Sequence, residues 1–261
     1  MNMNQSKAQW CRVAVKGEPV LGRIEGDVIV LYDGELFDNP SAREEHIPLA
    51  EAEWLPPCEP RQFLGLWNNF HERQQAEGTL VPDFPLYFVK LPGSIGAHRH
   101  VIPVPDDDSH VIKFEAELGI VIGRQCFRPS ASEIEAAIFG YTCVNDVTAG
   151  HVLFSNPEFP QWSRAKSWPG FGPLGPTITT GVQPDDLRVR AILDGEIRQE
   201  YPASGMIFPP RDIVGHIASE IPLFPGDVIA CGTSVGAVPV QPGQDIVIDI
   251  PGIGRLENRF G

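Results

Sequence analysis

The sequence lacks any hydrophobic run close to the roughly 18 residues that a membrane-spanning helix needs. Its N-terminal segment, residues 1–9, is polar and has no apolar stretch typical of a secretory signal peptide. Clusters of Lys and Arg are also missing, and the formal net charge is −14. Because a nucleic-acid surface requires clustered positive charge, the sequence predicts a protein that binds neither membranes nor nucleic acids.

Cysteine pairs and the commonest catalytic motifs are missing as well. The five cysteines lie far apart, and none belongs to a C-x-x-C pair. That spacing argues against a disulfide framework and a cysteine zinc site, and it favours a reducing compartment, so we expect a cytoplasmic protein. The sequence has no G-x-S-x-G, P-loop, G-x-G-x-x-G or H-E-x-x-H motif, which removes the common nucleotide-binding and serine-hydrolase interpretations.

Glycine and proline, by contrast, are abundant, with 26 of each in 261 residues. They divide the chain into short segments, which favours short strands joined by turns over long helices. The expected strands cover residues 12–15, 28–31, 63–66, 112–122, 189–193, 227–230 and 246–250. They outnumber the helices and do not alternate with them, so the predicted fold is α+β, mainly β, and not a doubly wound parallel sheet.

Two helices and one polar segment complete the expected elements. A capping-box pattern, Ser132-x-x-Glu135, begins a helix that ends near Gly140. The spacing of apolar residues predicts a second helix over residues 211–219. Residues 67–83 are polar and lack a sustained apolar stripe, so we expect a short helix or a mobile loop there.

A change in composition divides the chain near residue 58. A polar stretch rich in Glu and Ala ends at Pro56-Pro57, next to Cys58. We therefore expect a small N-terminal β module, residues 1–58, followed by a larger main domain, residues 59–261.

Two carboxylates open the strongest predicted strand. Residues two apart in a strand point to the same face, so Glu115 and Glu117 project together, roughly 6–7 Å apart along the chain. Such a pair beside an apolar continuation is unfavourable unless a cation neutralises it, and Mg²⁺ or Mn²⁺ binds carboxylate oxygens. On spacing alone, ordinary surface acids are the simpler interpretation. Asp146 follows a second apolar segment and, taken alone, is equally typical of a turn.

Two further segments contain candidate anion-binding groups. Lys166 precedes a Gly/Pro-rich stretch, where a lysine could neutralise a substrate carboxylate or be a solvated surface charge. A predicted strand leads into Gly232 and Thr233, whose backbone N–H groups could bind an anion, although a hairpin turn explains them equally well. His98 and His100 lie in a polar loop without a third ligand nearby, which argues against a metal site there.

Taken together and in this order, these motifs resemble the fumarylacetoacetate hydrolase family, over roughly residues 60 to 260. The matching segments are Phe114-Glu-Ala-Glu-Leu118, Gly140-Tyr-Thr-Cys-Val-Asn-Asp146, Ala165-Lys-Ser167, Pro173-Leu-Gly-Pro176, Asp194-Gly-Glu-Ile-Arg-Gln199, Met206-Ile-Phe208, Pro225-Gly-Asp-Val-Ile229, Gly232-Thr233 and Gly252-Ile-Gly-Arg-Leu-Glu-Asn258. The resemblance implies a mixed β-sandwich roll with a small N-terminal β module, in a homodimer that binds Mg²⁺ or Mn²⁺.

The resemblance also implies the roles of individual residues. The metal ligands would be Glu115, Glu117 and Asp146. Lys166 and the segment Gly232-Thr233 would contact the carboxylate end of a small 2-oxo acid. Such a site would stabilise the substrate's enolate, with the metal as a Lewis acid and Lys166 adding positive charge.

Several reactions pass through that enolate. The first interpretation is hydrolysis of a carbon–carbon bond in an acylpyruvate-type 2-oxo acid. The alternative is isomerisation, tautomerisation or decarboxylation of a 2-oxo dicarboxylate in aromatic catabolism. A third possibility is a non-catalytic homologue that binds a metal or ligand.

The sequence departs from the family pattern in the parts that activate water. Hydrolytic members carry a lid motif close to G-L-N-Y-x-x-H-x-x-E, whose His and Glu form a dyad. Here His71 occupies the histidine position and is the expected proton-transfer residue, whereas Gln74 replaces the glutamate. Glu72 is a doubtful substitute because on a helix it points about 100° away from His71. Gly150 replaces a family arginine after the metal aspartate, and Arg164 could restore that positive charge.

Overall fold

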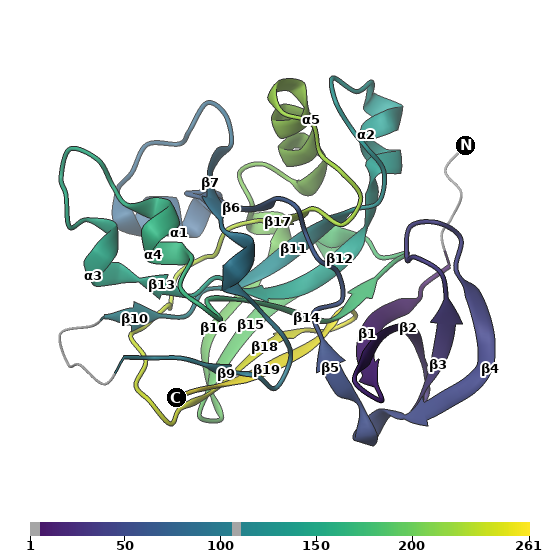
Figure 1. The fold of residues 1–261 in the computed structure, drawn as a ribbon. Helices are drawn as coiled ribbons and strands as arrows, with labels where there is room; N and C mark the ends of the chain where they lie inside the picture. The colour runs from purple at the N-terminus through teal and green to yellow at the C-terminus, as the bar shows by residue number, and fades with distance from the viewer. Residues whose placement is uncertain (1–5, 106–110) are drawn as a thin grey trace.

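The computed structural model describes residues 6–105 and 111–261 (Figure 1). Residues 1–5 of the polar N-terminal segment lie outside the described residues. None of the described helices is both long enough and apolar enough to cross a membrane.

One large mixed sheet forms the centre of the molecule (Figure 1). Its strands in spatial order are β4 (Ser41–Pro48), β3 (Val28–Asp33), β2 (Glu18–Glu25), β1 (Gln9–Val15), β14 (Gly172–Thr179), β12 (Ile138–Asn145), β11 (Ala116–Ile122), β17 (Val228–Ala230), β6 (Phe63–Trp67) and β7 (Leu86–Lys90). Two short strands attach to it, β5 (Glu53–Leu55) to β1 and β8 (Ile95–Gly96) to β14.

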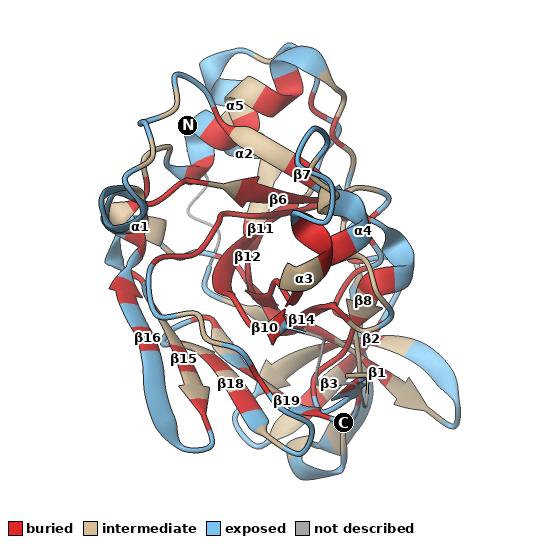
Figure 2. Ribbon diagram, turned by 90° about the vertical axis from the view of Figure 1, so that its left-hand side faces the viewer, coloured by how far each residue is buried: buried red, intermediate tan, exposed pale blue. Residues whose placement is uncertain are grey.

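A second sheet packs against the first. It consists of β16 (Glu196–Pro202), β15 (Arg188–Leu193), β18 (Asp245–Ile250), β19 (Gly254–Phe260) and β9 (Val101–Ile102). Alternate residues of β18 are buried, as expected for a strand with one face on the core. Every residue of β11 is buried, because other elements cover both of its faces. Figure 2 shows β11 and β12 in red at the centre, whereas β16 is largely exposed.

The remaining elements are short. A two-stranded ribbon joins β10 (Ile112–Lys113) to β13 (Thr148–Ala149). The helices are α1 (His71–Glu77), α2 (Ala131–Ala137), α3 (Gly150–Leu153), α4 (Trp162–Lys166) and α5 (Pro210–Glu220), with single 3₁₀ turns at Leu49–Glu51, Pro92–Ser94, Pro184–Asp186 and Ala203–Gly205. Helices α2 and α5 lie together at the top of Figure 1, and α4 packs against α3 and β7.

The expected fold class, mainly β with few helices, is confirmed. The helix expected after residue 132 was misplaced, because the capping box uses Ser130 and Glu133. Their reciprocal hydrogen bonds begin α2 two residues earlier than expected, and α2 ends at Ala137, where β12 follows. Two capping patterns overlap in this segment, and only the backbone shows which one caps the helix.

The N-terminal strands continue the sheet of the main domain. Residues Gln9 and Trp10 of β1 pair with Thr179 and Ile178 of β14. The side chain of Gln9 also donates a 2.9 Å hydrogen bond to the carbonyl oxygen of Ile253. The module expected at residues 1–58 is therefore joined to the main domain by backbone as well as side-chain hydrogen bonds.

Candidate active site

The pairing of β11 with β12 brings three acidic side chains together. Ala116 pairs with Asn145, so the start of β11 lies beside the end of β12. The backbone N–H of Asp146 donates a 2.8 Å hydrogen bond to the carbonyl oxygen of Glu115. Glu115, Glu117 and Asp146 are all buried, and ligand oxygens from the three lie within 4.8 Å of one another. The structure thus brings the three expected metal ligands into one cluster.

The surrounding groups shift the pKa values of Glu115 and Glu117 in opposite directions. Burial would raise the pKa of Glu115, but the cations of Lys166 and Arg73 outweigh it and lower the pKa to about 2. The pKa of Glu117 is raised well above its ordinary value, first by burial and then by the charges of Asp146 and Glu115. Full ionisation of the cluster therefore requires more positive charge than the surrounding side chains supply.

Lys166 lies directly on this cluster. It is the last residue of α4, and its ammonium group hydrogen-bonds to Glu115 Oε2 and Asp146 Oδ2. Burial would lower the pKa of Lys166, but the attraction of Asp146 and Glu115 raises it instead. The lysine therefore remains an ammonium group, positioned where positive charge counters the buried carboxylates.

A second buried lysine, Lys90, forms an ion pair with Asp146. Its Nζ lies 2.6 Å from Asp146 Oδ1 and 2.5 Å from the carbonyl oxygen of Lys166, at the end of α4. Sequence analysis did not identify this residue. The only local signal is the alternation in β7, where buried Phe88 and Lys90 flank exposed Val89.

The donor set fits a hard divalent cation. Carboxylate oxygens are the ligands that Mg²⁺ and Mn²⁺ prefer, and the cluster contains neither a thiolate nor an imidazole. Oxygens bound to one Mg²⁺ at about 2.1 Å lie at most about 4.2 Å apart. Small side-chain movements would therefore bring Glu115, Glu117 and Asp146 around one ion.

Arg73 of α1 contacts the cluster and was missed in the sequence. Its Nη1 lies 3.0 Å from Glu115 Oε1, and its Nε lies 2.8 Å from Glu77 Oε1. Arg164, which was expected to replace the family arginine absent at Gly150, is instead exposed on α4 and does not line the cavity described below. Arg73 supplies a guanidinium group from a different part of the chain.

The segment after β17 completes another side of the site. The backbone N–H of Gly232 donates a 2.8 Å hydrogen bond to Glu117 Oε2. Gly232 has a φ of +86°, and a Cβ there would lie 3.3 Å from Leu66 O, so only glycine fits without strain. The hydroxyl of Thr233 accepts a 2.9 Å hydrogen bond from Gln199, whose Oε1 also accepts one from the backbone of β11. Gln199 thus ties the Thr233 segment to the strand that carries Glu117.

A cavity of ≈ 510 Å³ includes Glu115, Glu117, Lys166 and Thr233 in its lining. Its volume is typical of a small-molecule site. The polar side of the lining also includes Arg73, Glu77, Lys113, Thr148 and His151. An apolar side is formed by Leu66, Trp67, Phe88, Val111, Leu153, Phe154 and Trp162. Charged groups and aromatic rings therefore meet in one cavity at the carboxylate cluster.

Three residues of the expected lid motif, His71, Glu72 and Gln74, lie on α1 and do not line this cavity. His71 is exposed in the first turn of α1, so the structure does not bring it to the carboxylates. Glu72 Oε2 accepts a 2.8 Å hydrogen bond from Ser234. The amide of Gln74 is hydrogen-bonded to the carbonyl oxygen of Thr79. No side chain of α1 is buried, which is consistent with a loosely packed element, and the predicted mobility of the lid remains a prediction.

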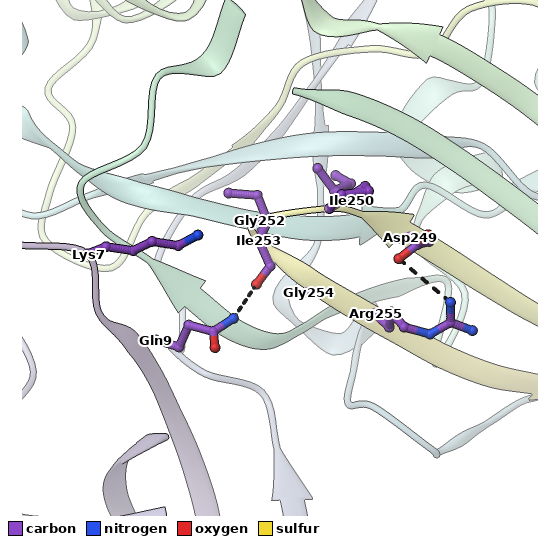
Figure 3. A pocket seen from close by; sticks show the side chains of 9 residues that line it. Lys7, Gln9, Asp249, Ile250, Gly252, Ile253, Gly254 and Arg255 are labelled. Carbon is purple, nitrogen blue, oxygen red and sulfur yellow. Dashed lines mark hydrogen bonds and ion pairs between the residues drawn. The ribbon is translucent and has the colours of Figure 1, made fainter. Parts of the chain in front are cut away.

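A second hollow of ≈ 210 Å³ lies at the turn between β18 and β19 (Figure 3). Lys7 and Gln9 approach it from the N-terminal strand, and Arg255 pairs with Asp249 at 3.7 Å. It has no cluster of carboxylates and belongs to the junction between the two expected parts of the chain. His98 is likewise structural, because burial lowers its pKa to about 4 and its Nδ1 accepts a hydrogen bond from the backbone of Glu257.

The fold and the acidic cluster agree with comparisons with known proteins. Residues 62–261 match the family model described as fumarylacetoacetate (FAA) hydrolase C-terminal, and residues 8–57 match one described as Rv2993c-like, N-terminal. The chain belongs to the fumarylacetoacetate hydrolase family.

Three similar proteins illustrate the range of this family. Protein Rv2993c of Mycobacterium tuberculosis is 35% identical over 259 residues, covering 91% of this chain and 96% of that protein. A solved structure of 2-hydroxyhepta-2,4-diene-1,7-dioate isomerase from Mycobacterium marinum is 31% identical, with a TM-score of 0.87 and coverage of 97% and 98%. The 4-hydroxyphenylacetate degradation bifunctional isomerase/decarboxylase of Salmonella dublin is 30% identical over 229 residues, or 86% of this chain but 52% of that protein.

Proposed function

We propose that this protein is a Mg²⁺- or Mn²⁺-dependent isomerase or tautomerase that moves a proton on a small 2-oxo acid through its enolate. The observation that carries the proposal is an imbalance in the site. The groups that would stabilise an enolate lie together, whereas His71, at the histidine position of the hydrolytic lid motif, lies outside the cavity lining and Gln74 replaces the glutamate of that motif. Hydrolysis, the first interpretation of the sequence, is therefore less well supported.

The roles of the side chains follow from their positions. A divalent cation held by Glu115, Glu117 and Asp146 would act as a Lewis acid on the enolate oxygen. Lys166, held as an ammonium group, would add positive charge where negative charge develops. Thr233 would position the substrate carboxylate, since its hydroxyl is already oriented by Gln199.

The altered lid supports proton transfer over hydrolysis. In the resembling hydrolases a glutamate orients the lid histidine, but Gln74 cannot accept a proton and its amide is engaged with Thr79. His71 alone can still move a proton if α1 turns its first turn toward the cavity. The names of two similar proteins, an isomerase and an isomerase/decarboxylase, agree with this proposal.

The test is to incubate the protein in D₂O with a panel of 2-oxo acids, with Mg²⁺, Mn²⁺ or EDTA, and to follow the reaction by NMR. Deuterium exchange at the carbon next to the keto group reports formation of the enolate, independently of the reaction that follows it. We expect metal-dependent exchange and a shifted double bond or tautomer without fragments. Two cleaved products from an acylpyruvate would overturn the isomerase assignment in favour of a hydrolase, and carbon dioxide would favour a decarboxylase.

A matched variant makes the distinction sharper. Gln74→Glu restores the acidic partner of the family motif and should create or raise hydrolysis of an acylpyruvate, while metal-dependent deuterium exchange stays close to that of the wild type. If the natural protein already hydrolyses acylpyruvates as fast as this variant, the replaced glutamate is not what limits water activation and the proposal fails.

A further inference from the structure

One basic side chain in the cavity has no acidic partner among the residues that the structure describes. Lys113 lies on β10, two residues before Glu115, so an extended backbone points both side chains toward the same side. Its pairing partner on β13 is Thr148, whose hydroxyl lies 3.3 Å from Glu115 Oε2. Lys113 is therefore placed beside the carboxylate cluster and lines the same cavity.

The other basic groups of the lining are already paired. Arg73 contacts Glu77 and Glu115, and Lys166 contacts Glu115 and Asp146. Among the residues that the structure describes, no carboxylate lies within ion-pair distance of Lys113. A half-buried ammonium group without an anion is a less favourable arrangement than a paired one, which leaves Lys113 available to a ligand.

The charges of the described lining also favour a ligand with two negative charges. The basic groups are Arg73, Lys113 and Lys166, and the carboxylates are Glu77, Glu115 and Glu117. Behind them, buried Asp146 is paired with Lys90. The positive and negative charges of these side chains are equal in number. A divalent cation in the cluster would therefore leave two positive charges for the ligand to neutralise. The carboxylate at the 2-oxo acid end supplies only one of the two negative charges required.

We propose that Lys113 is the residue that binds the distal carboxylate when the ligand is a 2-oxo dicarboxylate. This inference rests on the proposed function, because it assumes that the 2-oxo acid end lies at the acidic cluster. The volume of ≈ 510 Å³ leaves room for a distal group beyond a pyruvate-sized unit. Lys113 is then a specificity-determining residue, and takes no part in the proton transfer.

The test measures binding of ligands that cannot form the enolate. N-oxalyl amino acids carry an oxalyl group like that of a 2-oxo acid and a distal carboxylate, but an N–H replaces the reacting carbon. N-alkyl oxamates of equal length have the same oxalyl end and lack only the distal carboxylate. Calorimetric titration in Mg²⁺, over spacers of one to three carbons, compares the two series in the wild type, in Lys113→Met and in Lys113→Arg.

We expect the wild type to bind the best N-oxalyl amino acid about 10-fold more tightly than its matched oxamate, as for one charge-assisted contact. Lys113→Met should remove this preference without weakening the oxamate, and Lys113→Arg should keep most of it. Lys7→Met, which removes a lysine at the second hollow, is the control and should change neither affinity.

The outcomes separate this inference from the proposed function. If the oxamates do not bind in Mg²⁺, or bind equally in EDTA, the 2-oxo acid end is misassigned and the proposed function fails. If the oxamates bind only with metal but the preference is absent, or survives in Lys113→Met, the role of Lys113 is overturned while the proposed function stands.

Discussion

Arg73 Nη1 lies 3.0 Å from Glu115 Oε1, so a residue of helix α1 is ion-paired to a residue of the acidic cluster. The two residues come from different parts of the chain, one on the expected lid and one directly before β11. Because no side chain of α1 is buried, this ion pair and the Glu72–Ser234 hydrogen bond are the principal polar contacts that link the helix to the site. The position of α1 should therefore depend on the cluster.

Arg73→Met should loosen α1. A partly buried ion pair of this kind contributes on the order of 1 kcal/mol, which corresponds to roughly 5-fold faster local opening. Hydrogen–deuterium exchange of the backbone amides in residues 71–77 measures this. Arg73→Lys is the control and should show a smaller increase. Unchanged exchange in Arg73→Met would show that other contacts hold the helix.

Glu117→Gln should abolish specific binding of Mn²⁺ and yet stabilise the metal-free protein at neutral pH. The variant removes a ligand, so the loss should exceed the roughly 10- to 100-fold typical of outer partners of a metal site. At neutral pH the metal-free protein must either bury the charge of Glu117 beside Asp146 or hold a proton on it, and glutamine avoids both costs, while its amide oxygen can still accept the N–H of Gly232. Melting temperatures in EDTA and in Mn²⁺ test both effects. A lower melting temperature in EDTA would contradict the electrostatic argument.

Mn²⁺ affinity should rise with pH over a range set by Glu117. Its pKa in the folded protein is raised above the ordinary value of 4.5, so the metal-free protein retains a proton that the cation must displace. By the same sign, the contribution of Glu117 to metal-free stability is greatest below pH 4.5 and is lost as pH rises through its raised pKa. Titrations in buffers of different ionisation enthalpy should show proton release. If the apparent enthalpy is the same in all buffers, Glu117 is already ionised.

Lys166→Met should lower kcat while leaving Mn²⁺ affinity unchanged or increased. The variant removes positive charge from the position where an enolate would develop, and the loss of one such group typically costs about 10²–10³-fold. It also removes a cation that competes for Glu115 and Asp146. Steady-state kinetics and Mn²⁺ titration separate the two effects. A variant that loses Mn²⁺ binding would show that Lys166 chiefly holds the cluster together.

His71→Ala should reduce kcat by about 10²–10⁴-fold and leave ligand affinity nearly unchanged, if His71 carries the proton. The structure makes this a demanding test, because His71 is exposed and outside the lining. His151, which does line the cavity and accepts a 3.3 Å hydrogen bond from the backbone of Val111, is the matched comparison. Full activity of His71→Ala together with an inactive His151→Ala would transfer the proton-carrier role to His151.

The sequence alone was sufficient for features that depend on neighbouring residues or on an ordered set of motifs. The alternation in β18 and the spacing of Glu115 and Glu117 are local, because a strand places every second residue on one face. The order of the motifs identified the family over residues 60 to 260, and with it the three carboxylates that the structure brings within 4.8 Å.

Tertiary structure decided the features that depend on contacts between distant segments. Lys90 and Arg73 reach the acidic cluster from β7 and α1, and apart from the alternation in β7 nothing in the sequence around them distinguishes them from surface cations. Arg164, which lies nearer in sequence to Gly150, is outside the cavity lining, whereas Arg73 lines the cavity from a distant part of the chain. A side chain's partners follow from the packing of elements far apart in sequence, whereas its face on a strand follows from the backbone alone.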